Sequence, residues 1–170
     1  MGFKYRRGPQ DFYAMGPANE IRETQYGYAQ GAHIFYPGVS TCTTVTLLLT
    51  DGTAIGMHLA KADLTTDVDA IVNELNLVRA GRVVSTMYVV GVLRSRFGDG
   101  WMGEARYKWP IQLSTFNTAF GRNAGDPVSG YIQPEHTDQD YRAVVGGSSI
   151  AWFTRPNGTQ TWNNVDLETL

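Results

Sequence analysis

The chain has 170 residues, of which 42% are hydrophobic and 18% charged, so it can bury a core and does not belong to the disordered class. The net charge of −2 argues against nucleic acid as the main partner. A single cysteine excludes an intrachain disulfide, so folding does not require an oxidising compartment. No apolar run reaches membrane-spanning length, and no signal-peptide pattern is present. We expect one domain over residues 1–170, without a membrane span and monomeric.

The first 25 residues contain Gly8-Pro9 and Gly16-Pro17, which break regular structure. We expect residues 1–25 to wrap over the surface of the domain. A strand is predicted for about 26–36, ending at Pro37-Gly38.

Residues 43–50 and 53–60 are predicted to form a hairpin around the turn signal Asp51-Gly52. A two-residue turn would pair Thr50 with Thr53 and place the apolar residues of the two strands on different faces. A three-residue loop with Gly52 in the left-handed conformation pairs Leu49 with Thr53 instead. One face is then wholly apolar, and because burial fixes strand register, we predict this second pairing.

The predicted register places His58 opposite Thr44 and Cys42 opposite Ala60. Cys42 and His58 then lie on one face as diagonal neighbours, with Cα atoms roughly 5–8 Å apart. The register depends only on burying Val, Leu and Ile, so the proximity of the thiol and the imidazole is a consequence of the pairing.

The rest of the chain supplies two helices and further strands. An apolar stripe at helical spacing follows the capping-box-like pair Thr66 and Asp69 and ends at Gly81. A second helix is predicted from Pro110 to Gly121. Strands are predicted at 83–93, 128–132, 141–146, 149–154 and 159–165. About seven strands in consecutive runs and two helices indicate an α+β fold, a mixed, mainly antiparallel β-sandwich or layered sheet core with outer helices.

Cys42 and His58 are the leading candidate catalytic residues. An imidazole beside a thiol can take its proton and later return it to a leaving group. Gly38 allows close approach of the backbone, and the amides near Ser40, Thr41 and Cys42 are candidates for stabilising an oxyanion. A lone cysteine and a strand histidine also occur as ordinary core residues, so a structural role for both is the competing interpretation.

The other candidate sites have weaker patterns. His33 is a rival partner for Cys42, and Trp101, in a glycine-containing loop, is a candidate for substrate contact. The acidic run 135–140 lacks metal-ligand spacing, so we predict no metal site.

Val39-Ser40-Thr41-Cys42, followed by a strand, a turn and Gly56-Met57-His58, resembles the Cys-His core of the glutamine deamidases. This superfamily includes CheD, the chemoreceptor deamidase, the catalytic domains of the cytotoxic necrotizing factors and Burkholderia lethal factor. The likeness covers about residues 38–60, a short part of the chain.

The resemblance implies a β-sandwich or layered α/β core that hydrolyses a glutamine side chain of a protein substrate to glutamate, without a cofactor. It also implies a bacterial toxin, effector or housekeeping enzyme. Such a protein would lie in the bacterial cytoplasm or enter a host cell without a cleaved signal peptide. The family position that orients the histidine corresponds here to Tyr36, so a tyrosine hydroxyl or a local carbonyl would take this role.

Two alternatives remain open at the level of sequence. One is a non-enzymatic protein-binding module in which Cys42 is a packing residue. The other is a Cys-His peptidase or transglutaminase, which shares the nucleophile and differs in the acceptor that the cleft admits.

Overall fold

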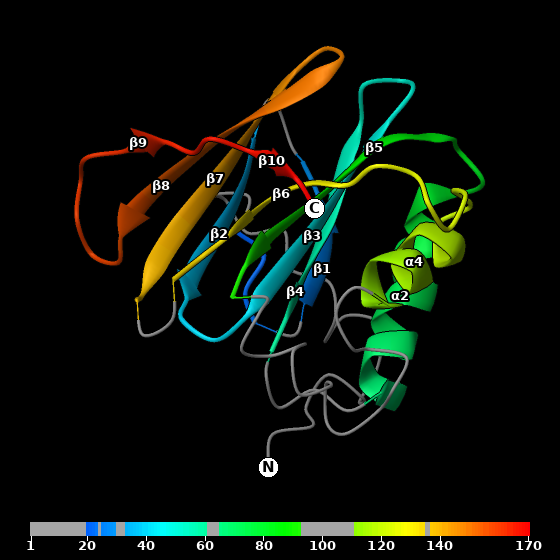
Figure 1. Ribbon diagram of the computed structural model, residues 1–170, viewed down its shortest axis with the longest axis horizontal. Helices are drawn as coiled ribbons and strands as arrows, with labels where there is room; N and C mark the ends of the chain where they lie inside the picture. Colours follow the sequence, from blue (N-terminus) through cyan, green and yellow to red (C-terminus); the bar gives the residue numbers. More distant parts are fainter. Residues whose placement is uncertain (1–19, 24, 30–32, 61–64, 93–110, 135–136) are drawn as a thin grey trace.

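The structure is a computed structural model that describes residues 20–23, 25–29, 33–60, 65–92, 111–134 and 137–170. These residues form three layers: a smaller sheet, a larger sheet and a pair of helices (Figure 1). The predicted α+β fold, a mainly antiparallel two-sheet core with two outer helices, is confirmed.

The larger sheet forms the middle layer. Its six strands are, in spatial order, β1 (Gln25–Tyr28), β4 (Ala54–Leu59), β3 (Thr43–Leu49), β5 (Val84–Gly91), β6 (Ser129–Ile132) and β10 (Glu168–Thr169). The pairing of β5 with β6 is parallel, and the other four pairings are antiparallel.

The smaller sheet packs on one face of the larger one. Its strands are, in spatial order, β2 (His33–Val39), β7 (Gln139–Gly146), β8 (Ser149–Pro156) and β9 (Asn163–Asn164), all antiparallel.

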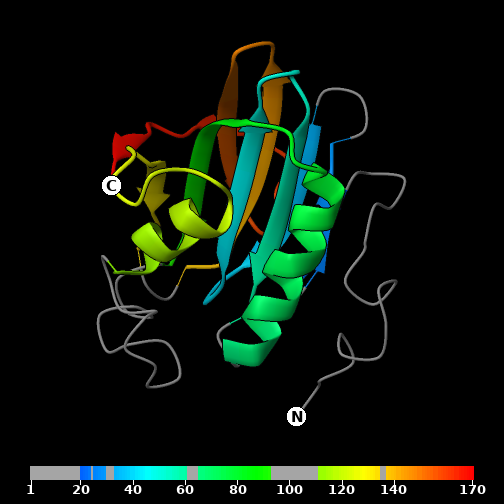
Figure 2. The ribbon, with the colours of Figure 1, turned by 90° about the vertical axis from the view of Figure 1, so that its right-hand side faces the viewer.

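The helices α2 (Thr65–Arg79) and α4 (Ile111–Ala119) cover the other face of the larger sheet (Figure 2). The predicted apolar stripe of α2 is buried, with Val68, Ile71 and Leu75 almost without exposed surface. The helix ends where Ala80 and Gly81 adopt positive φ angles of 53° and 75°. Asn76 Nδ2 donates to the carbonyl of Ala119 at 2.9 Å and ties α2 to the end of α4.

The hairpin has the predicted register. Val45 lies opposite Met57, Leu47 opposite Ile55 and Thr44 opposite His58. Gly52 has a φ of 85°, and the amide of Leu49 donates to the carbonyl of Thr53 at 2.8 Å. The odd-numbered apolar residues of both strands face the helices, as the burial argument required.

Two of the predicted strands were wrong in extent. The single strand at 26–36 is two strands in different sheets, because β1 pairs with β4 whereas β2 pairs with β7. Alternation of side chains persists on both sides of this break, so periodicity alone does not reveal it. In place of the strand at 159–165 only β9 forms; the amide of Val165 still donates to the carbonyl of Trp152 on β8 at 2.9 Å, and the chain then leads to β10 in the larger sheet.

In the described part of the N-terminal segment, Ile21 anchors the chain to the domain. Ile21 has no exposed surface, and its amide donates to the carbonyl of Phe35 on β2 at 2.9 Å. None of the described helices is long and apolar enough to cross a membrane.

Candidate functional site

Cys42 lies where the chain crosses from the smaller sheet to the larger one. A bend at Ser40 and Thr41 connects β2 to β3, and Thr41 is exposed whereas Cys42 is only 2% exposed. The carbonyl of Cys42 accepts a hydrogen bond from the amide of Val92 at 3.0 Å. The thiol therefore lies in the layer between the two sheets, and the residue before it in the chain, Thr41, is exposed to solvent.

Gly91 on β5 allows this close pairing beside Cys42. Its φ is 141°, and a Cβ at this position would lie 2.5 Å from the carbonyl oxygen of Cys42. A side chain would push β5 away from the start of β3, so glycine is required here.

His58 lies on the neighbouring strand and faces the same layer. It is fully buried and sits opposite Thr44, two residues beyond Cys42 on β3. Side chains two residues apart on a strand share a face, so Cys42 and His58 are diagonal neighbours on the inner face of the larger sheet. The pairing of His58 with Thr44 is as predicted.

The backbone of the N-terminal segment holds the imidazole of His58. Its Nδ1 lies 3.0 Å from the carbonyl oxygen of Ile21. A carbonyl oxygen only accepts hydrogen bonds, so Nδ1 is the donor; when the ring is neutral, its lone pair is therefore on Nε2. The orienting group is therefore a backbone carbonyl far away in the sequence.

The ring of Tyr36 packs against His58, but the Tyr36 hydroxyl does not form a hydrogen bond with the imidazole. The ring centroids are 6.0 Å apart and the planes meet at 81°, an edge-to-face arrangement. The Tyr36 hydroxyl lies 2.6 Å from Oγ1 of Thr46. Complete burial raises the pKa of Tyr36, so the phenol stays neutral at any ordinary pH. The hydroxyl predicted to orient the histidine is thus engaged elsewhere.

The predicted oxyanion residues differ in their environment. Gly38 sits in the irregular end of β2 with a φ of 62°, and its amide donates to Oδ1 of Asp140 at 3.0 Å. This amide is committed to a buried carboxylate, which also pairs with Arg155 at 2.9 Å. Ser40 is half-buried and Thr41 exposed, in the bend just before Cys42.

The rival partner His33 cannot reach the layer that holds Cys42. It precedes the fully buried Ile34 on β2, and alternation turns it to the outer face of the smaller sheet. Trp101, Glu135 and His136 lie outside the described residues. Among the residues that are described, no cluster of three or more His, Cys, Asp or Glu side chains has the geometry of a metal site.

Sequence reasoning missed the carbonyl of Ile21, because a main-chain oxygen leaves no residue signature. It also missed the buried carboxamide of Gln133, whose Nε2 donates to the carbonyl of Val39 at 2.7 Å. A lone glutamine after a short apolar strand gives no signal of such a role.

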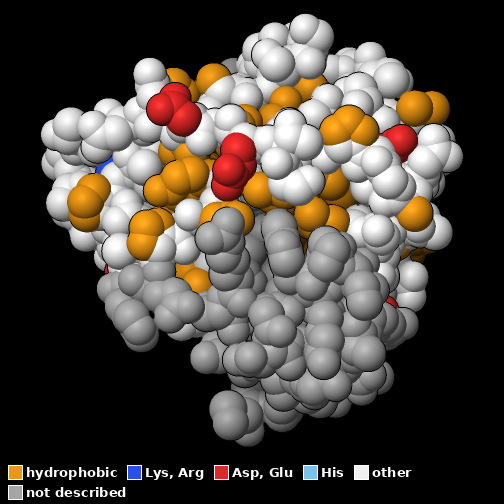
Figure 3. Space-filling model, in the orientation of Figure 1, with side chains coloured by type: hydrophobic (Ala, Val, Ile, Leu, Met, Phe, Trp, Pro, Cys, Tyr) orange, Lys and Arg blue, Asp and Glu red, His pale blue; other side chains and the backbone are white. Residues whose placement is uncertain are grey.

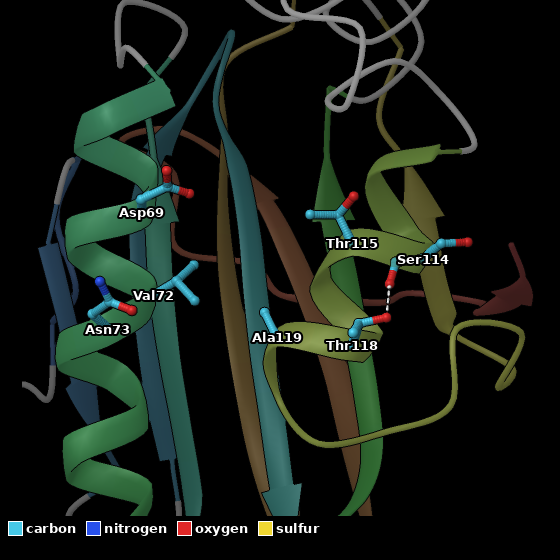
Figure 4. Close-up of a pocket in the computed structure, with 7 residues that line it drawn as sticks. All are labelled: Asp69, Val72, Asn73, Ser114, Thr115, Thr118 and Ala119. Atoms are coloured by element: carbon cyan, nitrogen blue, oxygen red, sulfur yellow. Dashed lines mark hydrogen bonds between the residues drawn. The ribbon is translucent and has the colours of Figure 1, made fainter.

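A separate groove of about 650 Å³ lies between α2 and α4 (Figure 4). It is lined by Asp69, Val72, Asn73, Ser114, Thr115, Thr118 and Ala119. The helices cover the face of the larger sheet opposite to the one that carries Cys42 and His58, so this groove is not part of their site.

On the face of the molecule seen in Figure 3, the described residues show hydrophobic and a few acidic side chains and hardly any Lys or Arg. The described residues of this face form no basic patch that would attract a polyanion. Comparison of the chain with protein-family models, with curated proteins and with solved structures gives no match.

Proposed function

We propose that Cys42 and His58 form the nucleophile and base of a cysteine amidohydrolase. One observation carries the proposal: both residues lie on the inner face of the β3–β4 hairpin as diagonal neighbours, and the Ile21 carbonyl orients the imidazole. A thiol, a base beside it and a third group that orients the base are the elements of nucleophilic catalysis by cysteine. The similarity of residues 38–60 to the glutamine deamidases selects a glutamine side chain of a protein as the substrate.

The reaction proceeds in two steps through a thioester. Nε2 of His58 takes the thiol proton, and the thiolate of Cys42 attacks the carboxamide carbon. The backbone amides at Ser40 to Cys42 stabilise the oxyanion. The C–N bond then breaks as His58 protonates departing ammonia. Water, deprotonated by His58, attacks the thioester, and the C–S bond breaks to give glutamate and restore the thiol.

The test is a search for glutamines converted to glutamate in bacterial and eukaryotic lysates after incubation with the protein. Mass spectrometry of the digested lysate is compared between wild type and Cys42→Ala, whose folding is checked by circular dichroism. We expect a small set of converted sites that is lost in Cys42→Ala. Conversion that persists in Cys42→Ala would refute the proposal. Cleaved or cross-linked products in place of converted ones would identify a peptidase or a transglutaminase.

The second candidate function is a protein-binding module without catalysis. The observation in its favour is that Cys42 is 2% exposed and packs in the cluster that fills the space between the two sheets. A structural thiol of this kind is inert until the protein unfolds. Its reaction with an alkylating reagent in the folded state therefore separates the two functions.

The proposal extends to the setting of the protein. We propose a monomeric bacterial enzyme that acts on a protein, in its own cytoplasm or as an effector in a host cell. Size-exclusion chromatography tests whether the protein is a monomer. Whether the converted proteins come from the bacterial or the eukaryotic lysate tests where the enzyme acts.

A further inference from the structure

A small polar cavity opens in the same layer between the sheets that contains Cys42. Its volume is about 140 Å³, and it is lined by Tyr131, Gln133, Pro134, Thr137, Gln139, Tyr141 and Thr154. Tyr131 pairs with Val90, which in turn pairs with Thr44, so Tyr131 shares the inner face of the larger sheet with Cys42. Tyr141, on the smaller sheet, closes the cavity from the opposite side.

Hydrogen bonds fix the side of the cavity that is next to the end of β2, where Gln133 lies. The Nε2 of Gln133 donates to the carbonyls of Val39 and Thr137 at 2.7 and 2.8 Å, and its Oε1 accepts from the Tyr141 hydroxyl at 2.8 Å. Gln133 is only 2% exposed. These groups shape the cavity and have no capacity left to donate to a ligand.

Two other groups that line the cavity can still donate a hydrogen bond to a ligand. The Oε1 of Gln139 accepts from Oγ1 of Thr154 at 3.1 Å. Within the part of the chain that the structure describes, the Nε2 of Gln139 and the hydroxyl of Tyr131 donate to no protein acceptor. A ligand that completes the cavity therefore offers an acceptor oxygen.

The lining also restricts the charge and size of the ligand. None of the lining residues that the structure describes carries a charge, so an ionised group would lose its hydration without a counter-charge from them. At about 30 Å³ for each water, the cavity has the volume of four to five waters. A primary carboxamide fits both limits, because it is neutral, has an acceptor oxygen and is of this size.

We propose that this cavity binds an asparagine or glutamine side chain of the substrate protein, different from the glutamine that Cys42 attacks. This assignment deepens the proposed function and rests on it for the identity of the ligand. Strands β3, β5 and β6 are consecutive neighbours, and Tyr131 lies level with Thr44, two residues from Cys42, so Tyr131 and Cys42 lie about 12 Å apart across the sheet. An extended substrate presents same-face side chains about every 7 Å, so a residue two to four positions from the target spans this distance to the cavity.

The test uses acetamide as the probe and acetate as its charged, equally sized control. Each is titrated into the full chain and followed by ¹H–¹⁵N correlation spectra. We expect saturable shifts confined to residues around the cavity with acetamide, with a Kd on the order of 10 mM, and binding of acetate at least about tenfold weaker. Tyr131→Phe should weaken acetamide binding about 3- to 10-fold, through the loss of one hydrogen bond. Tyr28→Phe, on the far edge strand β1, should leave acetamide binding unchanged.

The proposal is overturned if acetamide gives no saturable shift, if acetate binds equally well, or if Tyr131→Phe has no effect. The cavity would then be a space that holds water only. Binding is measured without turnover, so its failure leaves the chemistry of Cys42 untouched. An inert Cys42, in turn, leaves acetamide binding intact.

Discussion

At the scale of single residues, Gly56 is the position where β4 has no room for a side chain. An added Cβ would overlap the hydroxyl of Tyr36 and lie 3.2 Å from the carbonyl oxygen of Val45. The missing side chain lets Tyr36 cross the strand, reach Thr46 and pack its ring beside His58. Gly56 therefore shapes the site without belonging to it.

We predict that Gly56→Ala lowers the free energy of unfolding by about 1–3 kcal/mol, the usual effect of overfilling a packed interior. Urea denaturation measures it. Gly125→Ala is the matched control, because a Cβ at Gly125 meets nothing within 4 Å, and its effect should stay within about 0.5 kcal/mol. Tyr36→Phe removes the hydroxyl that the new methyl group overlaps, so Gly56→Ala should cost less in that background. Equal effects at Gly56 and Gly125 would contradict this account.

Tyr36 itself should matter for stability and not for the thiol. We predict that Tyr36→Phe costs about 1 kcal/mol, because the buried Thr46 hydroxyl loses its partner. The dependence of Cys42 alkylation on pH should stay as in wild type, since the Ile21 carbonyl orients His58. If Tyr36→Phe changed that dependence as a change at His58 does, Tyr36 would be the orienting group after all.

At the scale of elements, the hairpin depends on one glycine in its loop. Gly52 adopts a φ of 85°, which residues with a side chain rarely adopt. We predict that Gly52→Ala lowers the free energy of unfolding by about 1–3 kcal/mol and that Gly52→Asn costs less, because asparagine tolerates this conformation. Urea denaturation of both variants measures the difference. An alanine without effect would mean that the loop can take another form.

The elements also show how far the sequence determines the fold and the site. The β3–β4 register was predictable because only one pairing puts Val45, Leu47 and Leu49 with Ile55, Met57 and Leu59 on one face. The division of residues 26–36 into β1 and β2 was not, because the assignment of each strand to a sheet depends on distant partners in β4 and β7. The same limit hid the carbonyl of Ile21, whose contact with His58 spans 37 residues.

At the scale of the whole molecule, the larger sheet separates two hydrophobic cores, and tyrosines are buried in both. Burial and the carboxylate of Glu74 raise the pKa of Tyr26 to about 12. Burial also raises the pKa of Tyr36 and Tyr141. These phenols resist ionisation in the folded protein, whereas in the unfolded chain they ionise near pH 10.

We predict that the protein loses stability at alkaline pH. A raised pKa in the folded state means that the contribution of Tyr26 is fully present below about pH 10 and is lost between about pH 10 and pH 12. Urea midpoints across this range should fall steadily, and the fall should be smaller in Tyr26→Phe. A midpoint that is constant up to pH 12 would show that Tyr26 ionises equally in both states.

The central claim is that His58 controls the thiol of Cys42. The most direct test is the rate of iodoacetamide alkylation of the folded protein against pH, in wild type, in His58→Gln and in His33→Gln. Glutamine keeps a donor for the Ile21 carbonyl and cannot act as a base, and His33 faces away from Cys42. We predict that wild type and His33→Gln react well below pH 8.5, the usual thiol value, and that His58→Gln reacts only near it. A thiol that reacts only on unfolding, or whose reaction is the same in His58→Gln, would contradict the account and favour the binding module.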